Sequence, residues 1–407
     1  MNRTIWDSYQ TLLGDEVISP IFQLAKRLDG AKIVHVNATR SGGGVAEILM
    51  KMVPLMQALN FNTKWETIEG NADFFTCTKT FHNLFQGKGT DLPSKTLLRN
   101  FEEVNKQNSL RLGALIEEAD FVMIHDPQPL AMMPHLKKGK AKWIWRCHID
   151  TSHAPKAIWN YLRPFIELFD ASVYSLPDFS PKLNHPMFII PPGTDPFSEK
   201  NVALSPNEIH ALLSPFGIDF NRPTVLQVSR FDRFKDPLGV IQAYKIAKEH
   251  TPDLQLILVG GAAADDPEGA AVFNEVQEAK GTDPDIYLLN LPSDSHRIIN
   301  ALQTAANIVI QKSVKEGFGL TVTEALWKSK PVIAGNTGGI RIQVIDRHTG
   351  LLVDTPEGAA SAIGLLLENP ELGKAFGQTG RQHVQENFLM TRELRDYLAM
   401  MTLLKKN

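Results

Sequence analysis

Short runs of apolar, often β-branched residues alternate along the chain with longer stretches whose apolar positions have helical spacing. This alternation predicts parallel sheets built from strand–helix–strand units, and it occurs twice. In the first half the predicted strands span residues 33–38, 64–69, 121–126, 142–149, 171–176 and 187–192. In the second half they span residues 224–229, 254–260, 286–291, 307–312, 331–336 and 350–354.

The two halves are joined by PPGTDPFSEKN at 191–201, whose Pro, Gly and Asp residues favour an extended, turn-rich linker. No short-period repeat appears, so the doubled pattern predicts two doubly wound domains rather than a solenoid. We place these domains at 1–195 and 196–385. Residues 386–407 predict a C-terminal helix that could pack on either domain. We expect it to pack on the first domain. Ligands of such sheets bind beyond the carboxyl ends of the strands, and we expect the two domains to close on them.

Composition and charge narrow the class of protein. With 407 residues, 43% hydrophobic and 21% charged, the chain is an ordinary globular one of two to three domains. The formal charge of −3 provides no positive excess to cover a phosphate backbone, so a nucleic-acid partner is excluded. The two cysteines cannot form a disulfide framework, and no apolar run reaches the roughly 18 residues of a membrane span. We therefore expect a cytoplasmic protein without a membrane partner.

The loop TRSGGGVAEILMKM at 39–52 follows the first predicted strand. Gly42, Gly43 and Gly44 let the backbone approach a ligand closely, and the helix that starts there adds free N–H groups and the positive end of its dipole. A diphosphate or a sugar hydroxyl suits such a site. The spacing matches neither the dinucleotide fingerprint nor the Walker motif, and a flexible turn is the alternative reading.

The loop SRFDRFKD at 229–236 follows the first predicted strand of the second half. Arg230 offers a planar fork of donors and Lys235 a mobile point charge, a combination that suits two linked phosphates. Because Arg233 and two aspartates lie in the same segment, a solvated basic loop is the alternative.

The segment VKEGFGLTVTEALW at 314–327 gives the strongest site signal in the chain. Two turn glycines follow Glu316, and a helix is predicted directly after them. The backbone N–H groups of residues 317–321 would face a phosphate, Glu316 would accept hydrogen bonds from sugar hydroxyls, and Glu324 would hold a ribose diol. The alternative for Glu324 is the ordinary preference of acidic residues for a helix N-terminus.

The segment WRCHIDTSH at 145–153 gathers polar groups at the end of a predicted strand. His148 is suited to hydrogen-bond a substrate hydroxyl and Asp150 to hold an acceptor. A zinc site is the rival, but no paired C-x-x-C or H-E-x-x-H accompanies these residues, and Cys147 lies on the opposite face of the strand. A histidine satisfied within the core is the other alternative for His148.

Two weaker segments add acceptor-side candidates. HDPQP places His125 at a strand end, although its two prolines explain the segment equally well as a stiffened loop. Residues 68–83 contain Glu69, Lys79 and His82, which could line an acceptor pocket.

Arg230 and Lys235 form an R-x4-K pair and Glu316 and Glu324 an E-x7-E pair, and together these motifs resemble the retaining glycosyltransferases of family 4. That family has the α/β GT-B architecture, two Rossmann-like doubly wound parallel-sheet domains facing a central cleft. Over nearly the whole chain the resemblance is closest to the trehalose glycosyltransferring synthases. It rests on HVNATRSGGGVAEIL, TKTFHN, HDPQP, WRCHID, PPGTDP, VSRFD, DDPEG and EGFGLTVTEALWKSKPVI.

The resemblance implies transfer of glucose from a nucleoside-diphosphate glucose to the anomeric hydroxyl of glucose, giving α,α-trehalose with retention. The leaving diphosphate itself would deprotonate the acceptor, so fixed cations and dipoles matter more than a side-chain nucleophile. ADP-, UDP- and GDP-glucose all remain candidate donors. We expect no protein-held metal and no tightly bound cofactor, and the sequence leaves both Mg²⁺ carried by the nucleotide and a homodimer open.

When the family's site residues are transferred one by one to matching positions of this chain, the resemblance and the loop chemistry together imply three overlapping sets of site residues. The predicted catalytic residues are Arg230, Lys235, Glu316 and His148. The predicted donor-binding residues are Gly43, Gly44, Arg230, Lys235, Glu316, Gly317, Phe318, Gly319, Leu320, Thr321 and Glu324. The predicted acceptor-binding residues are Asn37, Glu69, His125, His148 and Asp150.

The chain departs from the family pattern at two places. Asp236 stands where the family usually has Gly, which adds a negative charge beside the proposed phosphate loop. Thr151 and His153 replace the expected residues of the acceptor-side segment, so acceptor identity is the softer expectation.

Other enzymes and a binding protein are the alternatives. A trehalose phosphorylase would use the loop of Arg230 and Lys235 for phosphate, and another family 4 enzyme would take a different acceptor. A sugar-nucleotide epimerase would need an acid/base pair and no acceptor site, and a nicotinamide-dependent oxidoreductase would need the G-x-G-x-x-G fingerprint, which is absent. A non-catalytic sugar-binding protein would not need both a basic loop and a glutamate-flanked helix start.

Overall fold

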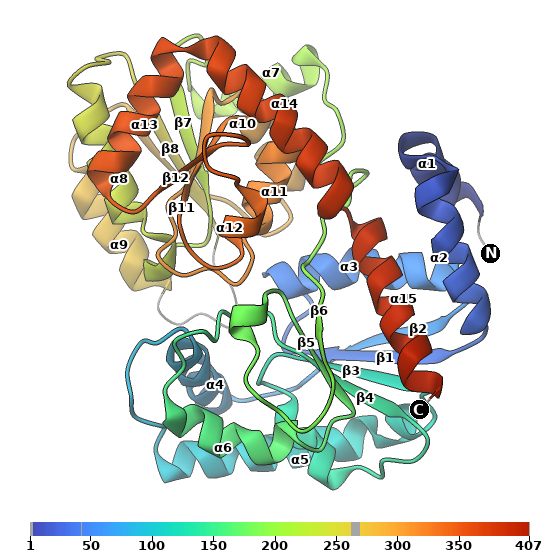
Figure 1. Cartoon of the computed structure of the whole chain (residues 1–407). Coiled ribbons are helices and arrows are strands. Elements are labelled where there is room, and N and C mark those ends of the chain that lie inside the picture. Colours follow the sequence, from blue (N-terminus) through green and yellow to red (C-terminus); the bar gives the residue numbers. More distant parts are fainter. Residues whose placement is uncertain (1–2, 42, 262–268, 407) are drawn as a thin grey trace. The chain divides into compact units, whose positions relative to one another are not determined.

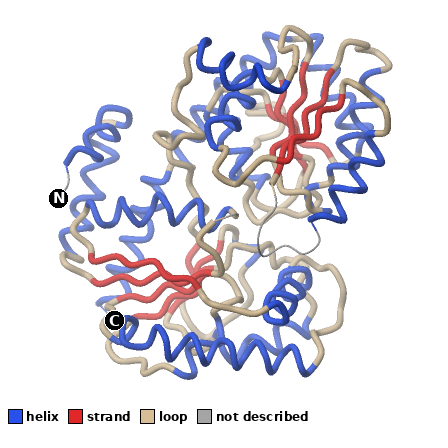
Figure 2. The backbone as a smooth tube through the Cα atoms, turned by 180° about the vertical axis from the view of Figure 1, so that it is seen from behind, coloured by secondary structure: helices blue, strands red, loops and turns tan. Residues whose placement is uncertain are grey.

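The computed structural model describes residues 3–41, 43–261 and 269–406 (Figure 1). It consists of two compact units, Met1–Gly193 with Met390–Asn407 and Thr194–Leu389. The chain thus passes into the second unit after Gly193 and returns to the first after Leu389. Each unit is built on its own six-stranded sheet, and Figure 2 shows helices on both faces of each sheet.

The first unit has the strand order β2-β1-β3-β4-β5-β6, and every pair is parallel. Because helices cover both faces, its central strands read as continuous apolar runs. Its strands are β1 (Lys32–Asn37), β2 (Asn62–Thr67), β3 (Phe121–His125), β4 (Lys142–Arg146), β5 (Ala171–Tyr174) and β6 (Met187–Ile189). One face carries α1 (Arg3–Leu13), α2 (Asp15–Arg27), α3 (Gly44–Ala58) and α15 (Met390–Lys406), and the other α4 (Ala72–Phe85), α5 (Lys95–Glu117) and α6 (Lys156–Ile166).

The second unit has the strand order β12-β11-β10-β7-β8-β9, again parallel throughout. Its strands are β7 (Thr224–Val228), β8 (Gln255–Gly260), β9 (Ile286–Asn290), β10 (Ile308–Gln311), β11 (Val332–Gly335) and β12 (Leu351–Val353). One face packs against α8 (Pro237–Lys248), α9 (Gly269–Lys280) and α13 (Pro356–Glu368). The remaining helices are α7 (Pro206–Leu213), α10 (His296–Ala305), α11 (Leu320–Trp327), α12 (Ile340–Gln343) and α14 (Pro370–Asn387).

The predicted α/β fold of two parallel sheets is confirmed, and each predicted strand corresponds to an observed one. The largest differences are at β6, which was expected to reach residue 192 but ends at Ile189, and at β4, which was expected to reach residue 149 but ends at Arg146. There the backbone N–H of His148 donates to Asp126 Oδ1 at 2.7 Å instead of to a neighbouring strand. The backbone N–H of His148 therefore bonds to a side chain and not to a strand, and the chain leaves the sheet at this point.

Helix α15 belongs to the first unit, where it packs against α2. Its Glu393 side chain is fully buried and accepts a hydrogen bond of 2.8 Å from the backbone N–H of Gly193. Burial raises the pKa of this carboxyl group, against the opposing charges of Arg146 and Arg392. This buried contact anchors the last residue of the first unit's main segment to the helix that ends the chain.

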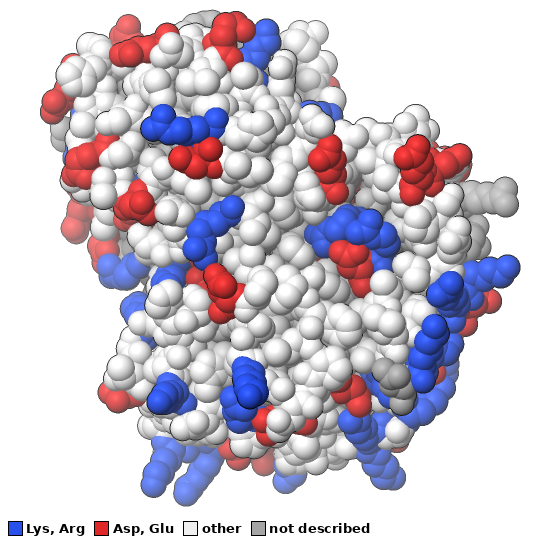
Figure 3. Space-filling model, in the orientation of Figure 1, with Lys and Arg blue, Asp and Glu red and all other residues white. Residues whose placement is uncertain are grey.

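Charges of both signs are interspersed over the face drawn in Figure 3, and much of that face carries neither. This agrees with the near balance of 42 basic and 45 acidic residues. Among the described residues, no helix combines the length and the apolar character needed to cross a membrane.

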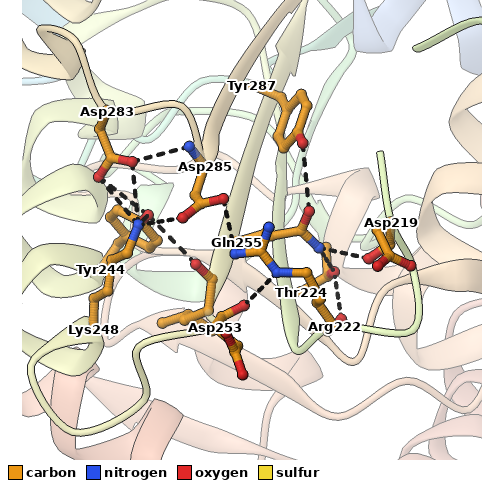
Figure 4. A network of polar contacts seen from close by, with 11 residues as sticks. Asp219, Arg222, Thr224, Tyr244, Lys248, Asp253, Gln255, Asp283, Asp285 and Tyr287 are labelled. Atoms are coloured by element: carbon orange, nitrogen blue, oxygen red, sulfur yellow. Dashed lines mark hydrogen bonds and ion pairs between the residues drawn. The ribbon is translucent and has the colours of Figure 1, made fainter. Parts of the chain in front are cut away.

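A polar network secures the second unit at the amino ends of β7, β8 and β9 (Figure 4). Lys248 Nζ lies 2.7 Å from Asp285 Oδ2 and 3.2 Å from Asp283 Oδ1, and Arg222 Nη2 lies 2.8 Å from Asp285 Oδ1. The hydrogen bond from Lys248 is the main cause that lowers the pKa of Asp285. The network lies at the end of the sheet opposite to the ligand-binding edge, so we assign it to stability.

Replacing Asp285 by Asn is expected to lower the free energy of unfolding at pH 7 by about 1 kcal/mol, because the network is only partly shielded from water. A lowered pKa stabilises the fold above the unfolded-state pKa of about 3.9, so the difference from wild type should shrink as the pH falls below about 4. Thermal unfolding followed by circular dichroism at several pH values measures this. Asp253→Asn is the matched control, because Asp253 accepts from Arg222 through its backbone carbonyl, which the substitution keeps. Equal losses in both variants would contradict the assignment.

Candidate functional site

The order of strands in the second unit brings two of the predicted loops together. Strands β7 and β10 are neighbours, and from this pair the chain winds to β8 and β9 on one side and to β11 and β12 on the other. Such a reversal leaves a crevice at the carboxyl ends of the two central strands, where ligands of these folds bind. The loop 229–236 leaves β7 at this edge, and the loop 312–319 leaves β10.

Lys235 and Glu316 meet at this edge although 81 residues separate them. Lys235 Nζ donates to Glu316 Oε2, and Ser313 Oγ donates to the same carboxylate oxygen at 3.1 Å. The backbone of Lys235 is also fixed, because Gln227 Nε2 donates to its carbonyl oxygen at 2.8 Å. The structure therefore pairs two of the predicted catalytic residues directly, as a cation and an anion on adjacent loops.

Asp236, the departure from the family pattern, has a specific structural place. Its backbone is left-handed, with φ of 51°, a conformation that glycine adopts without cost. One carboxylate oxygen accepts from the N–H of Gly239 at 3.1 Å and so caps α8, while the other accepts from Lys312 Nζ. Lys312 is only 4% exposed, so the negative charge of Asp236 is matched by a buried cation that sequence analysis missed.

The arginines of the same loop have different surroundings. Arg233 forms an ion pair with Glu275 of α9, with Nη1 at 2.8 Å from Oε2. Arg230 is the second residue after the end of β7 and is half-buried. The side chain of Arg233 therefore contacts the neighbouring helix, whereas Arg230 lies next to the carboxyl end of β7, at the ligand-binding edge.

Helix α11 begins at Leu320, as predicted, with Gly319 as its N-cap at φ of 92°. No side chain of the described residues caps this end, which leaves its first backbone N–H groups without a side-chain acceptor, as an anion site requires. A Cβ atom on residue 319 would lie 3.2 Å from Cγ of Glu316, in addition to the strain of a positive φ. Glycine here therefore allows Glu316 to lie against the helix start.

Glu324 lies inside α11 and is 4% exposed. Its Oε1 is 3.8 Å from Lys200 Nζ, and Lys328 one turn later donates to its backbone carbonyl at 3.3 Å. Burial lowers the pKa of Lys328 to about 7, partly opposed by the charge of Glu324. The predicted ribose-binding carboxylate is thus accompanied by two lysines that the motif did not indicate.

Gly339 packs against the loop that contains Glu316, and sequence analysis did not single it out. Its N–H donates to the carbonyl oxygen of Glu316 at 3.1 Å. A Cβ atom at 339 would lie 2.5 Å from Cα of Phe318 and 2.6 Å from the carbonyl oxygen of Gly317. The paired glycines after the strand at 331–336 were the available signal, but only the tertiary contact shows what they approach.

If a nucleotide sugar binds at this edge, as the sequence analysis expects, Gly339→Ala should raise its KM by tenfold or more, because the added methyl group displaces the backbone of residues 317 and 318. Steady-state kinetics over a range of donor concentrations measures this. The control is Gly364→Ala in α13, where a Cβ atom meets nothing within 4 Å. An unchanged KM in the Gly339 variant would contradict this expectation, because it would show that the loop accommodates the methyl group without loss of binding.

In the first unit, Gly43 and Gly44 lie at the predicted helix start, and α3 begins at Gly44 with Gly43 as its N-cap. A Cβ atom on Gly43 would meet nothing within 4 Å, so the fold itself leaves room at this position. Gly42 lies outside the described residues, as does most of the DDPEG segment.

His148 is linked to two further histidines at the carboxyl ends of β1, β3 and β4. His35 Nδ1 is 3.0 Å from His125 Nε2, and His125 Nδ1 is 3.0 Å from His148 Nε2. His35 and His125 are almost completely buried, and His148 is half-buried. Both ring nitrogens of His125 face other histidines. We therefore place His125 behind His148, whereas the sequence had suggested that His125 contacts an acceptor.

Asp150 is 2% exposed, and its Oδ1 accepts from Ser152 N at 3.0 Å and from Ser152 Oγ at 2.6 Å. The other predicted acceptor residues are engaged elsewhere. Asn37 donates to the carbonyl of Thr39 at 2.8 Å and accepts from Trp65 Nε1 at 2.7 Å. Glu69 is exposed, with Oε1 at 3.4 Å from Arg111 Nε. Asn37 and Glu69 thus contact Trp65 and Arg111 in this structure, and their place at an acceptor stays a prediction.

Within the described part of the chain, no group of three or more His, Cys, Asp or Glu side chains is arranged to hold a metal ion. The three clustered histidines bond to one another. Burial is the main cause that raises the pKa of the nearby Cys147 thiol, which is fully buried.

Comparison with known proteins shows to which family the chain belongs. Residues 35–181 match the family described as trehalose synthase, N-terminal domain, and residues 212–383 match the glycosyl transferases group 1. A trehalose synthase of Rubrobacter xylanophilus is 44% identical over 96% of this chain and 95% of its own length. A trehalose synthase of Pyrococcus horikoshii is 41% identical over 97% of this chain and 95% of its own.

More distant proteins are also similar to this chain. A trehalose phosphorylase of Pleurotus pulmonarius is 27% identical over 93% of this chain but only 58% of its own length. Among solved structures, an α,α-trehalose-phosphate synthase (UDP-forming) from Burkholderia xenovorans in complex with glucose-6-phosphate superposes with a TM-score of 0.75. It is 14% identical and the match covers 92% of this chain and all of that one, which supports the GT-B fold alone. On the full-length identities, this chain is a glycosyltransferase that belongs to the trehalose synthase family.

Proposed function

We propose that this protein is a retaining glucosyltransferase that makes α,α-trehalose from a nucleoside-diphosphate glucose and free glucose. The observation that carries the proposal is the pairing of Lys235 with Glu316 beside the uncapped start of α11. A mobile cation, a carboxylate suited to sugar hydroxyls and outward N–H groups are what a sugar diphosphate requires. The 40–44% identity to trehalose synthases favours glucose as both the transferred group and the acceptor.

In the proposed reaction the bond between C1 of glucose and the diphosphate oxygen breaks, and its electron pair stays with the diphosphate. The anomeric hydroxyl oxygen of the acceptor bonds to C1 on the same face, and its proton passes to an oxygen of the departing diphosphate. Arg230, Lys235 and the N-terminus of α11 stabilise the developing negative charge. Glu316 binds the transferred sugar, and Glu324 binds the ribose.

The first unit contributes the acceptor-side groups in this proposal. Asp150 accepts hydrogen bonds from acceptor hydroxyls, and His148 contacts a hydroxyl of the sugar. Gly43 and Gly44 leave space for close approach of the ligand. No resident metal is part of the proposal; Mg²⁺ enters, if at all, with the nucleotide.

The test is to incubate the purified protein with glucose and, in parallel, with ADP-, UDP- or GDP-glucose or with α- or β-glucose 1-phosphate. Products are followed by NMR, which also reports the anomeric configuration. Trehalose with a free nucleoside diphosphate supports the proposal and identifies the base. Trehalose from a glucose phosphate only would replace it with a phosphorylase, and no trehalose from any donor would overturn it in favour of another acceptor or a binding role.

A further inference from the structure

Three imidazole rings form a continuous chain in the first unit. His35 lies on β1, His125 at the end of β3 and His148 just after β4, and these strands are neighbours in the sheet. Successive rings contact through nitrogen atoms 3.0 Å apart, and their centroids are 5.3 Å apart at interplanar angles of 28° and 18°. None of the three sequence motifs that contain these residues indicated this contact.

The three rings carry no charge near neutral pH. Burial lowers the pKa of His35 to about 4. Burial also lowers the pKa values of His125 and His148 well below their usual range, and the charge of Arg146 on β4 acts in the same direction. A neutral imidazole has one N–H donor and one acceptor nitrogen, so each ring must donate on one side and accept on the other.

Only two arrangements of hydrogens satisfy both contacts. In the first, every ring carries its hydrogen on Nδ1, so His35 donates to His125, His125 donates to His148, and His148 presents an N–H from its remaining nitrogen. In the second, every hydrogen is on Nε2 and all donations are reversed. His148 would then present a bare nitrogen, which is the form of a general base.

The buried end of the chain distinguishes the two arrangements. Among the described residues, Nε2 of His35 has no hydrogen-bond partner, and the side chain is 1% exposed. The second arrangement would bury an N–H donor there without an acceptor, whereas the first leaves only a lone pair. Buried donors without a partner are rarer in proteins than acceptors without one.

We propose that His35 and His125 are positioning residues that hold His148 in the tautomer with its hydrogen on Nδ1. His148 then donates a hydrogen bond to an oxygen atom of the bound sugar and does not act as a base. This agrees with a transfer in which the diphosphate accepts the proton of the acceptor. The consequence for catalysis rests on the proposed function, whereas the tautomer itself does not.

The direct test is long-range ¹H–¹⁵N NMR of the full-length protein labelled with ¹⁵N in histidine, at pH 7 and without ligand. Signals are assigned by single histidine variants. We expect a protonated Nδ1 and an unprotonated Nε2 in all three rings, opposite to the form that free imidazole side chains favour in water. A protonated Nε2 in His148 would overturn the proposal, whatever the protein does with nucleotide sugars.

A matched pair of variants tests the positioning role. His35→Asn keeps an N–H group near the position of Nδ1 and is expected to preserve both the His148 tautomer and the turnover. His35→Phe keeps the ring but removes the donor, so His148 should become a mixture of tautomers and kcat should fall about tenfold while the KM for the donor changes little. Equal kcat values and equal His148 spectra in the two variants would overturn the role of His35. If the Phe variant fails to fold, the wild-type spectrum still decides the tautomer.

Discussion

Lys235→Ala is expected to lower kcat/KM for the nucleotide sugar by about 1,000-fold without unfolding the protein. The substitution removes a cation from the proposed diphosphate site and also leaves the buried carboxylate of Glu316 without its lysine partner, with Ser313 still donating to it. That uncompensated negative charge would then repel the phosphates. Initial rates of nucleoside diphosphate release measure the effect, and circular dichroism checks that the variant is folded.

The same loop supplies the control for Lys235. Arg233 has the same charge and lies two residues away, but its ion pair with Glu275 directs it to α9. Arg233→Ala should therefore keep a rate close to wild type. Glu316→Ala should also reduce transfer by orders of magnitude, and Lys235→Arg should recover part of the loss. Near-normal rates in both the Lys235→Ala and Glu316→Ala variants would refute the assignment of the donor site.

Asp150→Ala is expected to lower kcat/KM for the proposed acceptor, glucose, by about 100-fold while the affinity for the nucleoside diphosphate is preserved. A buried carboxylate that accepts from sugar hydroxyls forms charge-assisted hydrogen bonds, which are the stronger kind. Acceptor kinetics at saturating donor and calorimetric titration with the nucleoside diphosphate measure the two effects separately.

Asp150 also holds the turn at Ser152, so its variants must separate turn geometry from acceptor binding. Asp150→Asn keeps an oxygen that can accept from Ser152 but removes the charge, and Ser152→Ala removes one of the hydrogen bonds to the carboxylate. We expect Asp150→Asn to lose most of the acceptor affinity and Ser152→Ala to lose little. Loss of nucleotide binding in Asp150→Ala would place this residue on the donor side instead.

The local structure of the proposed donor site was predictable because its residues lie on short segments next to strand ends. Glu316 and the start of α11 are only a few residues apart, so their proximity follows from the local turn. Lys312 was not predictable in the same way, since at the end of NIVIQK it looks like a strand residue facing solvent. Its role depends on Asp236, 76 residues earlier, and that contact exists only because β7 and β10 are neighbours.

The contacts among the proposed acceptor-side residues were not predictable, for a related reason. His148 and His125 were singled out from separate loops, but the order of β1, β3 and β4 in the sheet turns them into one chain with His35. His35 gave no signal because it lies inside an apolar strand. Asn37 is the last residue of β1 and Glu69 follows β2, and only the tertiary structure shows that their side chains contact Trp65 and Arg111.

The sequence by itself determined where strands, helix starts and turn glycines lie, because apolar periodicity and glycine placement act over a few residues. Strand order and burial, which depend on contacts between residues far apart in the chain, were decided only by the tertiary structure. It paired Lys235 with Glu316, neutralised Asp236 with Lys312 and linked the three histidines. The motifs therefore identified the kind of chemistry, and packing selected which side chains are in position to perform it.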